Sequence, residues 1–377
     1  MKKIIAKGLI ILIISVCICL LADIMVYADF EEDIISEYDF GDMEEFINND
    51  NDLENIEFKE IINEFMKGDA QKGFQKILDI MYELLLKNLI SNKDILKRIV
   101  IIAVLASIFT NFSKILKNSQ VSEMGFTVCY MMIISFLAVS FNMLSVMASA
   151  TISKMVDFMK ALLPVYIVTV GVSDGQPAAS TYYQVTLVVI TIIEVFCLKV
   201  LLPAMNLYVV ITIINNIHKE DYMSKICSLI KSGVSFAIKG MLTVVTGLNV
   251  IRQMFTPLNS KVGINASKNV LGVMSGVSKM GSNLTELVYG TGNILKNYIG
   301  GVGLIVLSII ILIPIVKVVI YIFMYQVTNV MLQPVSDKRI VECMEGITQG
   351  AILLLRIVFS VSLMFMITIA IVCLNNG

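Results

Sequence analysis

Long apolar runs, separated by single charges or short polar stretches, fill the chain from residue 97 to its C-terminus. A membrane-spanning helix needs about 20 mostly apolar residues. Some uncharged intervals reach this length alone, and others reach it if the helix tilts or a flanking lysine snorkels to the headgroups. These intervals are 99–113, 124–153, 161–173, 175–193, 200–218, 240–251, 297–316, 318–336 and 357–377. They predict an all-α, polytopic integral membrane protein with about seven transmembrane helices, some kinked or short, although about six or eight spans fit as well. The first part of the membrane body comprises residues 97–256, and a C-terminal transmembrane pair occupies residues 301–377.

The first 28 residues have the pattern of a signal peptide. Lys2, Lys3 and Lys7 precede an apolar core, and Ala28 follows at a suitable cleavage position. We therefore expect the mature chain to begin at Asp29, with an uncleaved anchor as the alternative. In either case the following segment faces away from the cytoplasm, because lysine-rich N-terminal regions stay inside.

The exported segment divides into an acidic lead and two amphipathic helices. Residues 29–60 contain 14 acidic residues against one lysine, so we expect residues 29–52 to be disordered. Apolar residues then recur at helical spacing within 53–96 and predict helices at 53–67 and 70–92. The apolar faces of these helices would lie on the membrane surface, on the membrane body or on a partner.

A short motif occurs twice in the membrane body, 39 positions apart. Lys160 and Pro164 bracket the first copy, and Lys199 and Pro203 bracket the second. A proline inside an apolar helix frees a carbonyl that needs another polar partner, so the pair suggests two adjacent kinked helices beside a polar conduit. Two ordinary helix starts, with proline in the first turn, are the simpler interpretation.

Glu194 is an acid near the end of an otherwise uncharged run. An ionisable group within a membrane is costly and is usually partnered, so we expect it to pair with Lys160 or Lys199. A position at the lipid headgroups would make such a partner unnecessary.

Residues 257–300 differ from the rest because they are rich in Gly, Ser and Asn, with single lysines. They predict an amphipathic helical segment that is not a lipid-facing span. Gly272 and Gly276 form a small-xxx-small pair that allows close helix approach. This helix would line a wet cavity or contact a neighbouring subunit, or else connect two spans at the membrane interface.

Composition excludes most other classes of protein. Hydrophobic residues make up 57% of the chain and charged residues 16%, with a mean hydropathy of +0.82, which leaves too little polar surface for a soluble protein. From residue 61 onward Lys and Arg outnumber acids by 25 to 15, but they are scattered singly, as in membrane flanks, so we expect no nucleic-acid binding.

Recognisable chemistry is missing from the sequence. The seven cysteines show neither a disulfide pattern nor zinc-ligand spacing, and His218 is the single histidine. Neither a phosphate-binding glycine loop nor a metalloprotease motif occurs. We therefore expect no enzymatic activity, with no catalytic, cofactor-binding or metal-binding residues.

The ordered set of segments resembles the stage III sporulation protein AE family of endospore-forming bacteria. The stretches that carry the resemblance are 159–166 with 171–180, 199–203, 295–305 and 332–340, and the likeness covers nearly the whole chain. It implies a multi-pass subunit of a channel-like, secretion-like complex between mother cell and forespore, required for late forespore development. The implied partners are a secretion-type ATPase, ring-forming proteins of the same operon and a forespore-side protein.

The same resemblance implies a location in the mother-cell membrane around the forespore, with the N-terminal segment facing the intermembrane space. It brings no catalytic residues with it. A secondary permease for a small metabolite is the alternative function, and the repeated motif at Lys160 and Lys199 supports that alternative.

Overall fold

The computed structural model describes residues 119–173, 176–217, 222–272, 278–334 and 337–374, with three isolated helical positions before them. The predicted signal peptide, the acidic lead, the helices within 53–96 and, apart from isolated positions, the span at 99–113 lie outside the described residues.

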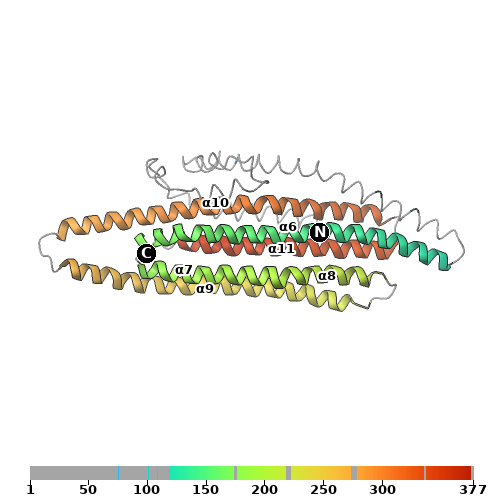
Figure 1. Cartoon of the computed structure of the whole chain (residues 1–377), viewed down its shortest axis with the longest axis horizontal. Coiled ribbons are helices and arrows are strands. Elements are labelled where there is room, and N and C mark those ends of the chain that lie inside the picture. Colours follow the sequence, from blue (N-terminus) through green and yellow to red (C-terminus); the bar gives the residue numbers. More distant parts are fainter. Residues whose placement is uncertain are drawn as a thin grey trace.

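The described chain is helical throughout and contains no strand, which confirms the predicted all-α class. Its elements are α6 (Ser119–Ser173), α7 (Gln176–Phe196), the π-helical segment η2 (Cys197–Leu201), α8 (Leu202–Asn215), α9 (Ser224–Gly272), α10 (Ser278–Leu332) and α11 (Lys338–Leu374). Because α7, η2 and α8 follow one another without a break, they form one long rod. The resulting five rods run up and down side by side in an elongated bundle (Figure 1).

Five of the described helical stretches are long and apolar enough to cross a membrane. They are Tyr130–Pro164, Tyr183–Asn215, Ser224–Leu248, Val306–Leu332 and Lys338–Ala370. Several intervals that the sequence separates are therefore joined: 124–153 with 161–173, 175–193 with 200–218, and 297–316 with 318–336. The physical reason is that a single lysine or acid does not end a helix, since its long side chain reaches a polar region while the backbone hydrogen bonds continue.

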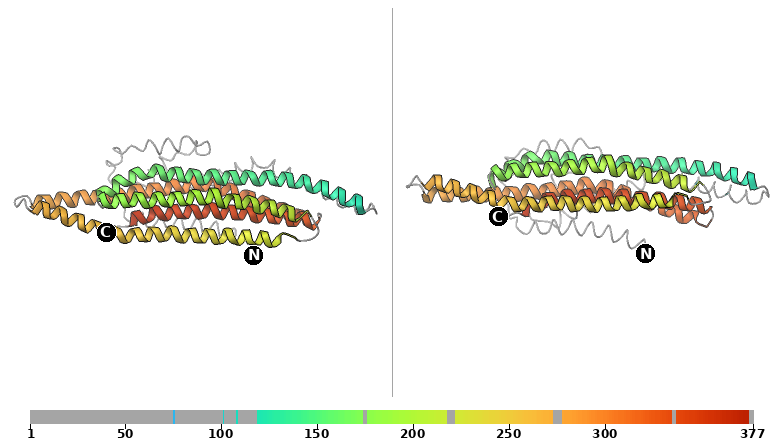
Figure 2. Two further views of the ribbon diagram at one scale, coloured as in Figure 1. Left: turned by 60° about the horizontal axis from the view of Figure 1, so that its bottom comes forward. Right: turned by 90° about the horizontal axis from the view of Figure 1, so that it is seen from below.

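The core of the bundle is built around α11. This helix contacts α6, α8, α9 and α10, and 67% of the most apolar window of its span is buried, against 22% for α9. Its inward face carries fully buried Leu354, Val361 and Phe365. α11 is therefore the central element, and α9 is a peripheral one (Figure 2).

The Gly/Ser-rich segment predicted at 257–300 forms the end of α9 and the beginning of α10, which extend past the ends of the other helices (Figure 2). The side chains of this extension lie outside the described residues, so its exclusion from the membrane spans stays a prediction. With 55 residues, α10 is about 80 Å long, far more than the roughly 30 Å of a bilayer's hydrocarbon core.

Candidate functional site

Glu194 pairs with Lys160, one of the two lysines that the sequence offers. The antiparallel packing of α6 against α7 brings Lys160 Nζ to 3.0 Å from Glu194 Oε2, where the lysine donates a hydrogen bond. The two side chains are 48% and 36% exposed, so the ion pair lies on the outer surface of the bundle. Lys199 lies in η2 and is exposed. Of the two pairings expected from the sequence, the structure therefore forms the one between neighbouring helices.

The two prolines of the repeated motif lie in different surroundings. Pro164 lies inside α6, whereas Pro203 lies in the first turn of α8, directly after η2. The π-helical turn shifts the hydrogen-bonding pattern just before Pro203, and the N–H of Leu202 donates to the carbonyl of Cys197. A proline without an N–H is accommodated at such a shift without orphaning a carbonyl inside a regular helix.

The helices that carry the prolines do pack together, but the prolines themselves are not neighbours. Lys160 and Glu194 lie at one level, Pro164 is four residues nearer the α6–α7 turn, and Pro203 is nine residues farther from it. These 13 residues correspond to a separation of about 20 Å along the bundle. The helices of the repeated motif are therefore adjacent, as the sequence suggests, but their two prolines do not adjoin.

As a consequence, Pro164→Ala and Pro203→Ala should act independently on stability. Sites this far apart without shared partners add to within about 0.5 kcal/mol. The free energies of unfolding of both single variants and the double variant, measured by SDS titration in mixed micelles, test this. An interaction energy well above that margin would show that the two breaks are coupled after all.

Two glycines of α11 that sequence reasoning missed allow a close approach between helices. A Cβ at Gly350 would lie 2.8 Å from Val209 Cγ2 and 3.1 Å from Phe141 Cε2, and a Cβ at Gly346 would overlap the methyl group of Thr212. Gly346 and Gly350 therefore let α11 pack directly on α8 and α6. The signal was the four-residue spacing of the two glycines within an apolar helix.

The structure describes one residue of the predicted small-xxx-small pair, Gly272 and Gly276. Gly272 is the last residue of α9, whereas Gly276 lies outside the described residues. Whether these two glycines form a contact face stays a prediction.

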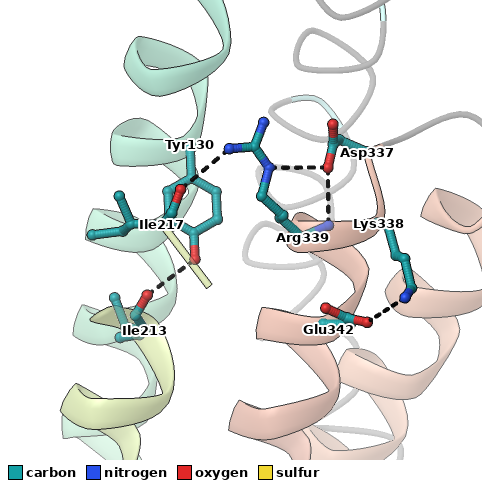
Figure 3. Close-up of polar contacts among 7 residues, drawn as sticks. All are labelled: Tyr130, Ile213, Ile217, Asp337, Lys338, Arg339 and Glu342. Atoms are coloured by element: carbon teal, nitrogen blue, oxygen red, sulfur yellow. Dashed lines mark hydrogen bonds and ion pairs between the residues drawn. The ribbon is translucent and has the colours of Figure 1, made fainter. Parts of the chain in front are cut away.

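A second set of contacts holds the carboxyl end of α8 (Figure 3). Tyr130 on α6 donates from its hydroxyl to the carbonyl of Ile213, with 3.1 Å between the oxygens. From the start of α11, Arg339 Nη1 donates to the carbonyl of Ile217 at 3.2 Å. Because the last carbonyls of a helix have no partner within it, these two side chains satisfy groups that the helix leaves open.

Asp337 orients this arginine and begins α11. Its Oδ1 accepts from Arg339 Nε at 3.3 Å and from the Arg339 backbone N–H at 3.0 Å (Figure 3). The second bond is a helix N-cap, and the first fixes the direction of the guanidinium group. Lys338 and Glu342 form a neighbouring ion pair that is largely exposed. One aspartate therefore starts α11 and aims the arginine at α8.

The interior of the described bundle offers little for chemistry. The buried polar side chains are Ser140, Ser145, Thr151, Thr186, Thr212, Thr328, Thr348, Ser362 and Thr368, so none of them is charged. Among the described residues no group of three or more His, Cys, Asp or Glu side chains is placed to hold a metal ion. The arrangement is suited to packing and positioning.

Comparison with known proteins agrees with these features. The model of the family "Stage III sporulation protein AE" matches residues 56–375. The chain is also 22% identical to the stage III sporulation protein AE of Bacillus subtilis (strain 168) over 310 residues, which cover 82% of this chain and 78% of that protein. No solved structure matches. Since the family model covers most of the chain, including all five rods, this protein belongs to the stage III sporulation protein AE family.

Proposed function

We propose that the protein is a membrane subunit of a channel-like, secretion-like complex that links mother cell and forespore. Membership of the stage III sporulation protein AE family, over residues 56–375, carries this proposal and implies a role in sporulation. The partners proposed are a secretion-type ATPase, ring-forming proteins of the same operon and a forespore-side protein. The proposed location is the mother-cell membrane around the forespore, with the N-terminal segment in the intermembrane space.

The proposed role is structural, without an enzymatic or transport cycle of the protein's own. A proton- or sodium-driven permease depends on an ionisable group within the membrane. In the described bundle the buried polar side chains are hydroxyls, and the carboxylate of Glu194 is half exposed and paired with Lys160. These observations favour a subunit that acts through shape and packing over the alternative, a secondary permease for a small metabolite.

Copurification tests the proposal directly. A tagged full-length chain, extracted in mild detergent from sporulating cells, should carry the ATPase and the ring-forming proteins with it. Recovery of this chain alone, from cells in which those proteins are present, would contradict the complex and favour the permease.

Glu194→Gln tests the absence of ion coupling. Because the Lys160–Glu194 pair is exposed, its loss should cost less than about 1 kcal/mol and leave spore yield near the wild-type level. Glu342→Gln is the matched control, since it removes the acid of another exposed pair. If Glu194→Gln abolishes sporulation while its protein level and complex assembly equal those of the control, the permease is the better account.

A further inference from the structure

Most charged side chains in the middle of the bundle gather at one level along its axis. The cations are Lys154, Lys160, Lys199, Lys239, Lys317 and Arg356, and each of the five candidate spans supplies at least one of them. Two acids, Asp157 and Glu194, lie among them. We call these six cations the cation belt, and with the two acids the belt has a net charge of about +4 at neutral pH.

Contacts between helices establish the level of each cation. The Lys160–Glu194 pair aligns α6 with α7, at 3.0 Å. Ser362 on α11 donates to the sulfur of Met155 on α6 at 3.6 Å, which aligns these two helices. Arg356 is six residues from Ser362, so it lies about 9 Å from that level along the axis.

α9 is aligned with α11 in the same way. Lys231 Nζ donates to Gln349 Oε1 at 3.3 Å, and the two helices run in the same direction. Lys239, eight residues farther along α9, therefore lies level with residue 357 of α11, beside Arg356.

α10 brings the last member to this level. The hydroxyls of Ser140 and Tyr325 are 2.6 Å apart and align α10 with α6, which runs in the opposite direction. Lys317, eight residues along α10 from Tyr325, then lies opposite residue 148 of α6, close to the level of Arg356. The whole belt is about 18 Å thick along the bundle axis.

Exposed large apolar side chains encircle the bundle on one side of the belt. Between the cation belt and the end held by Arg339, four helices present them, among them Met132, Val146, Leu207, Leu229, Phe236 and Val330, which are 53–79% exposed. We call this band of exposed apolar side chains the girdle. Exposing so large an apolar surface to water is unfavourable, whereas contact with lipid tails is favourable. Tyr183, Leu187 and Val188 are exposed on the other side of the belt, on α7.

The height of this apolar girdle matches a bilayer. On α11, 17 residues separate Arg339 from Arg356, which corresponds to about 26 Å. A hydrocarbon core is about 30 Å thick, and lysine or arginine side chains at its edges snorkel outward. In the described bundle, two charged side chains lie near the middle of the girdle. Lys231 is half-buried and bonded to Gln349, and Glu345 on α11 is exposed but not without a partner.

The opposite side of the belt is a poorer site for hydrocarbon. Residues 357–374 of α11 are also uncharged. A bilayer at their level would however enclose Lys160, Glu194 and Arg252 on the neighbouring helices, and the first two of these are exposed at the bundle surface. Charged groups facing lipid at that depth are costly.

We propose that the hydrocarbon core surrounds the girdle between Arg339 and Arg356, and that the exposed belt cations nearest to it, Lys199, Lys239 and Arg356, bind the headgroups of anionic phospholipids. Each cation near an anionic membrane surface contributes roughly 1 kcal/mol of attraction. The remaining length of α6, α7, α9, α10 and α11 then projects from the membrane on the side of the belt. The long helices of the bundle are thus only partly membrane-embedded.

The distribution of positive charge also indicates which end of the bundle faces the cytoplasm. Among the described residues from 119 onward, eleven Lys and Arg lie at the belt or beyond it, toward the α9–α10 turn, against four toward the Arg339 end. Lysine and arginine accumulate on the cytoplasmic side, so the belt faces the cytoplasm and the Arg339 end faces away from it. The start of α6 then lies on the side that faces away from the cytoplasm.

Two leucines on the rod formed by α7, η2 and α8 test how deep each part of the bundle lies in the bilayer. Leu207 on α8 and Leu187 on α7 are 53% and 42% exposed, and the 20 residues between them span about 30 Å. Each is replaced by cysteine in the full-length chain with its native cysteines changed to alanine, labelled with a fluorophore and reconstituted in phosphatidylcholine–phosphatidylglycerol vesicles. Doxyl-labelled lipids should quench the label at 207, and aqueous iodide the label at 187. The reverse pattern, or equal quenching at both positions, would overturn the assignment.

Two pairs of lysines test the headgroup contact. Lys199→Gln with Lys239→Gln removes exposed belt cations, and Lys225→Gln with Lys338→Gln removes exposed lysines at the other end. In nanodiscs assembled from an equal mixture of the two lipids, the belt variant should retain at least about twofold less phosphatidylglycerol around the protein, with the control unchanged. Equal retention by both variants would show that the belt does not select anionic headgroups.

Discussion

Replacing Gly346 by alanine is expected to destabilise the protein by about 1–3 kcal/mol, because the new methyl group overlaps the methyl group of Thr212 on α8. Thr212 cannot simply rotate away, since its hydroxyl donates to the carbonyl of Tyr208 at 2.8 Å. The helices must therefore move apart or this hydrogen bond must break. The free energy of unfolding in mixed micelles measures the loss, and spore yield should fall with it.

The matched control is Gly240→Ala. A Cβ at Gly240, in the middle of α9, meets nothing within 4 Å, so the substitution should leave stability unchanged or raise it by up to about 1 kcal/mol through helix propensity. Gly346→Ala and Gly240→Ala should thus have effects of opposite sign. Thr212→Ser keeps the hydroxyl and removes the methyl group, so the double variant with Gly346→Ala should recover stability. Equal behaviour of the two glycine variants would refute close packing at Gly346.

Arg339→Met should cost about 2 kcal/mol of stability, in the range of hydrogen bonds made by charged groups. The arginine side chain is only 13% exposed, and its loss leaves the carbonyl of Ile217 and one contact of Asp337 unsatisfied. The carboxyl end of α8 would then lose one of the two side-chain contacts that Figure 3 shows to its backbone carbonyls. The free energy of unfolding in mixed micelles is again the measurement.

Lys338→Met is the control for this second prediction. Lys338 is the adjacent residue, its side chain is 87% exposed, and its pair with Glu342 is of the i,i+4 type, worth no more than about 0.5 kcal/mol. Arg339→Lys should also lose stability, because an ammonium group cannot replace the planar guanidinium group that reaches both Asp337 and Ile217. Similar losses for Lys338→Met and Arg339→Met would mean that the buried contacts do not hold α8.

Part of this structure could be predicted from the pattern of apolar and charged residues. That pattern predicts an all-helical membrane protein and names Lys160 as one of two candidate partners for Glu194, and the structure confirms both points. These features depend on local composition or on a few residues of known chemistry. Predicting the boundaries was less successful, because an isolated charge interrupts an apolar run without interrupting the helix.

The contacts between helices could not be predicted in the same way. The sequence contains several glycine pairs, and Gly346 with Gly350 was overlooked, while open surface surrounds Gly233, Gly240 and Gly247. Whether a glycine is needed depends on which helix faces it. The repeated motif suggested two adjacent helices, but it did not give their register, which separates Pro164 from Pro203.

The sequence by itself determined that this protein is helical, that it belongs in a membrane and which family it resembles, because these properties follow from residues counted along one chain. Only the tertiary structure decided that α11 is central, that Arg339 and Tyr130 both hold the end of α8, and that six separate cations share one level. The physical reason is that such properties depend on the alignment of helices distant in sequence. That alignment is set by side-chain packing and by a few hydrogen bonds between helices, and no local pattern encodes it.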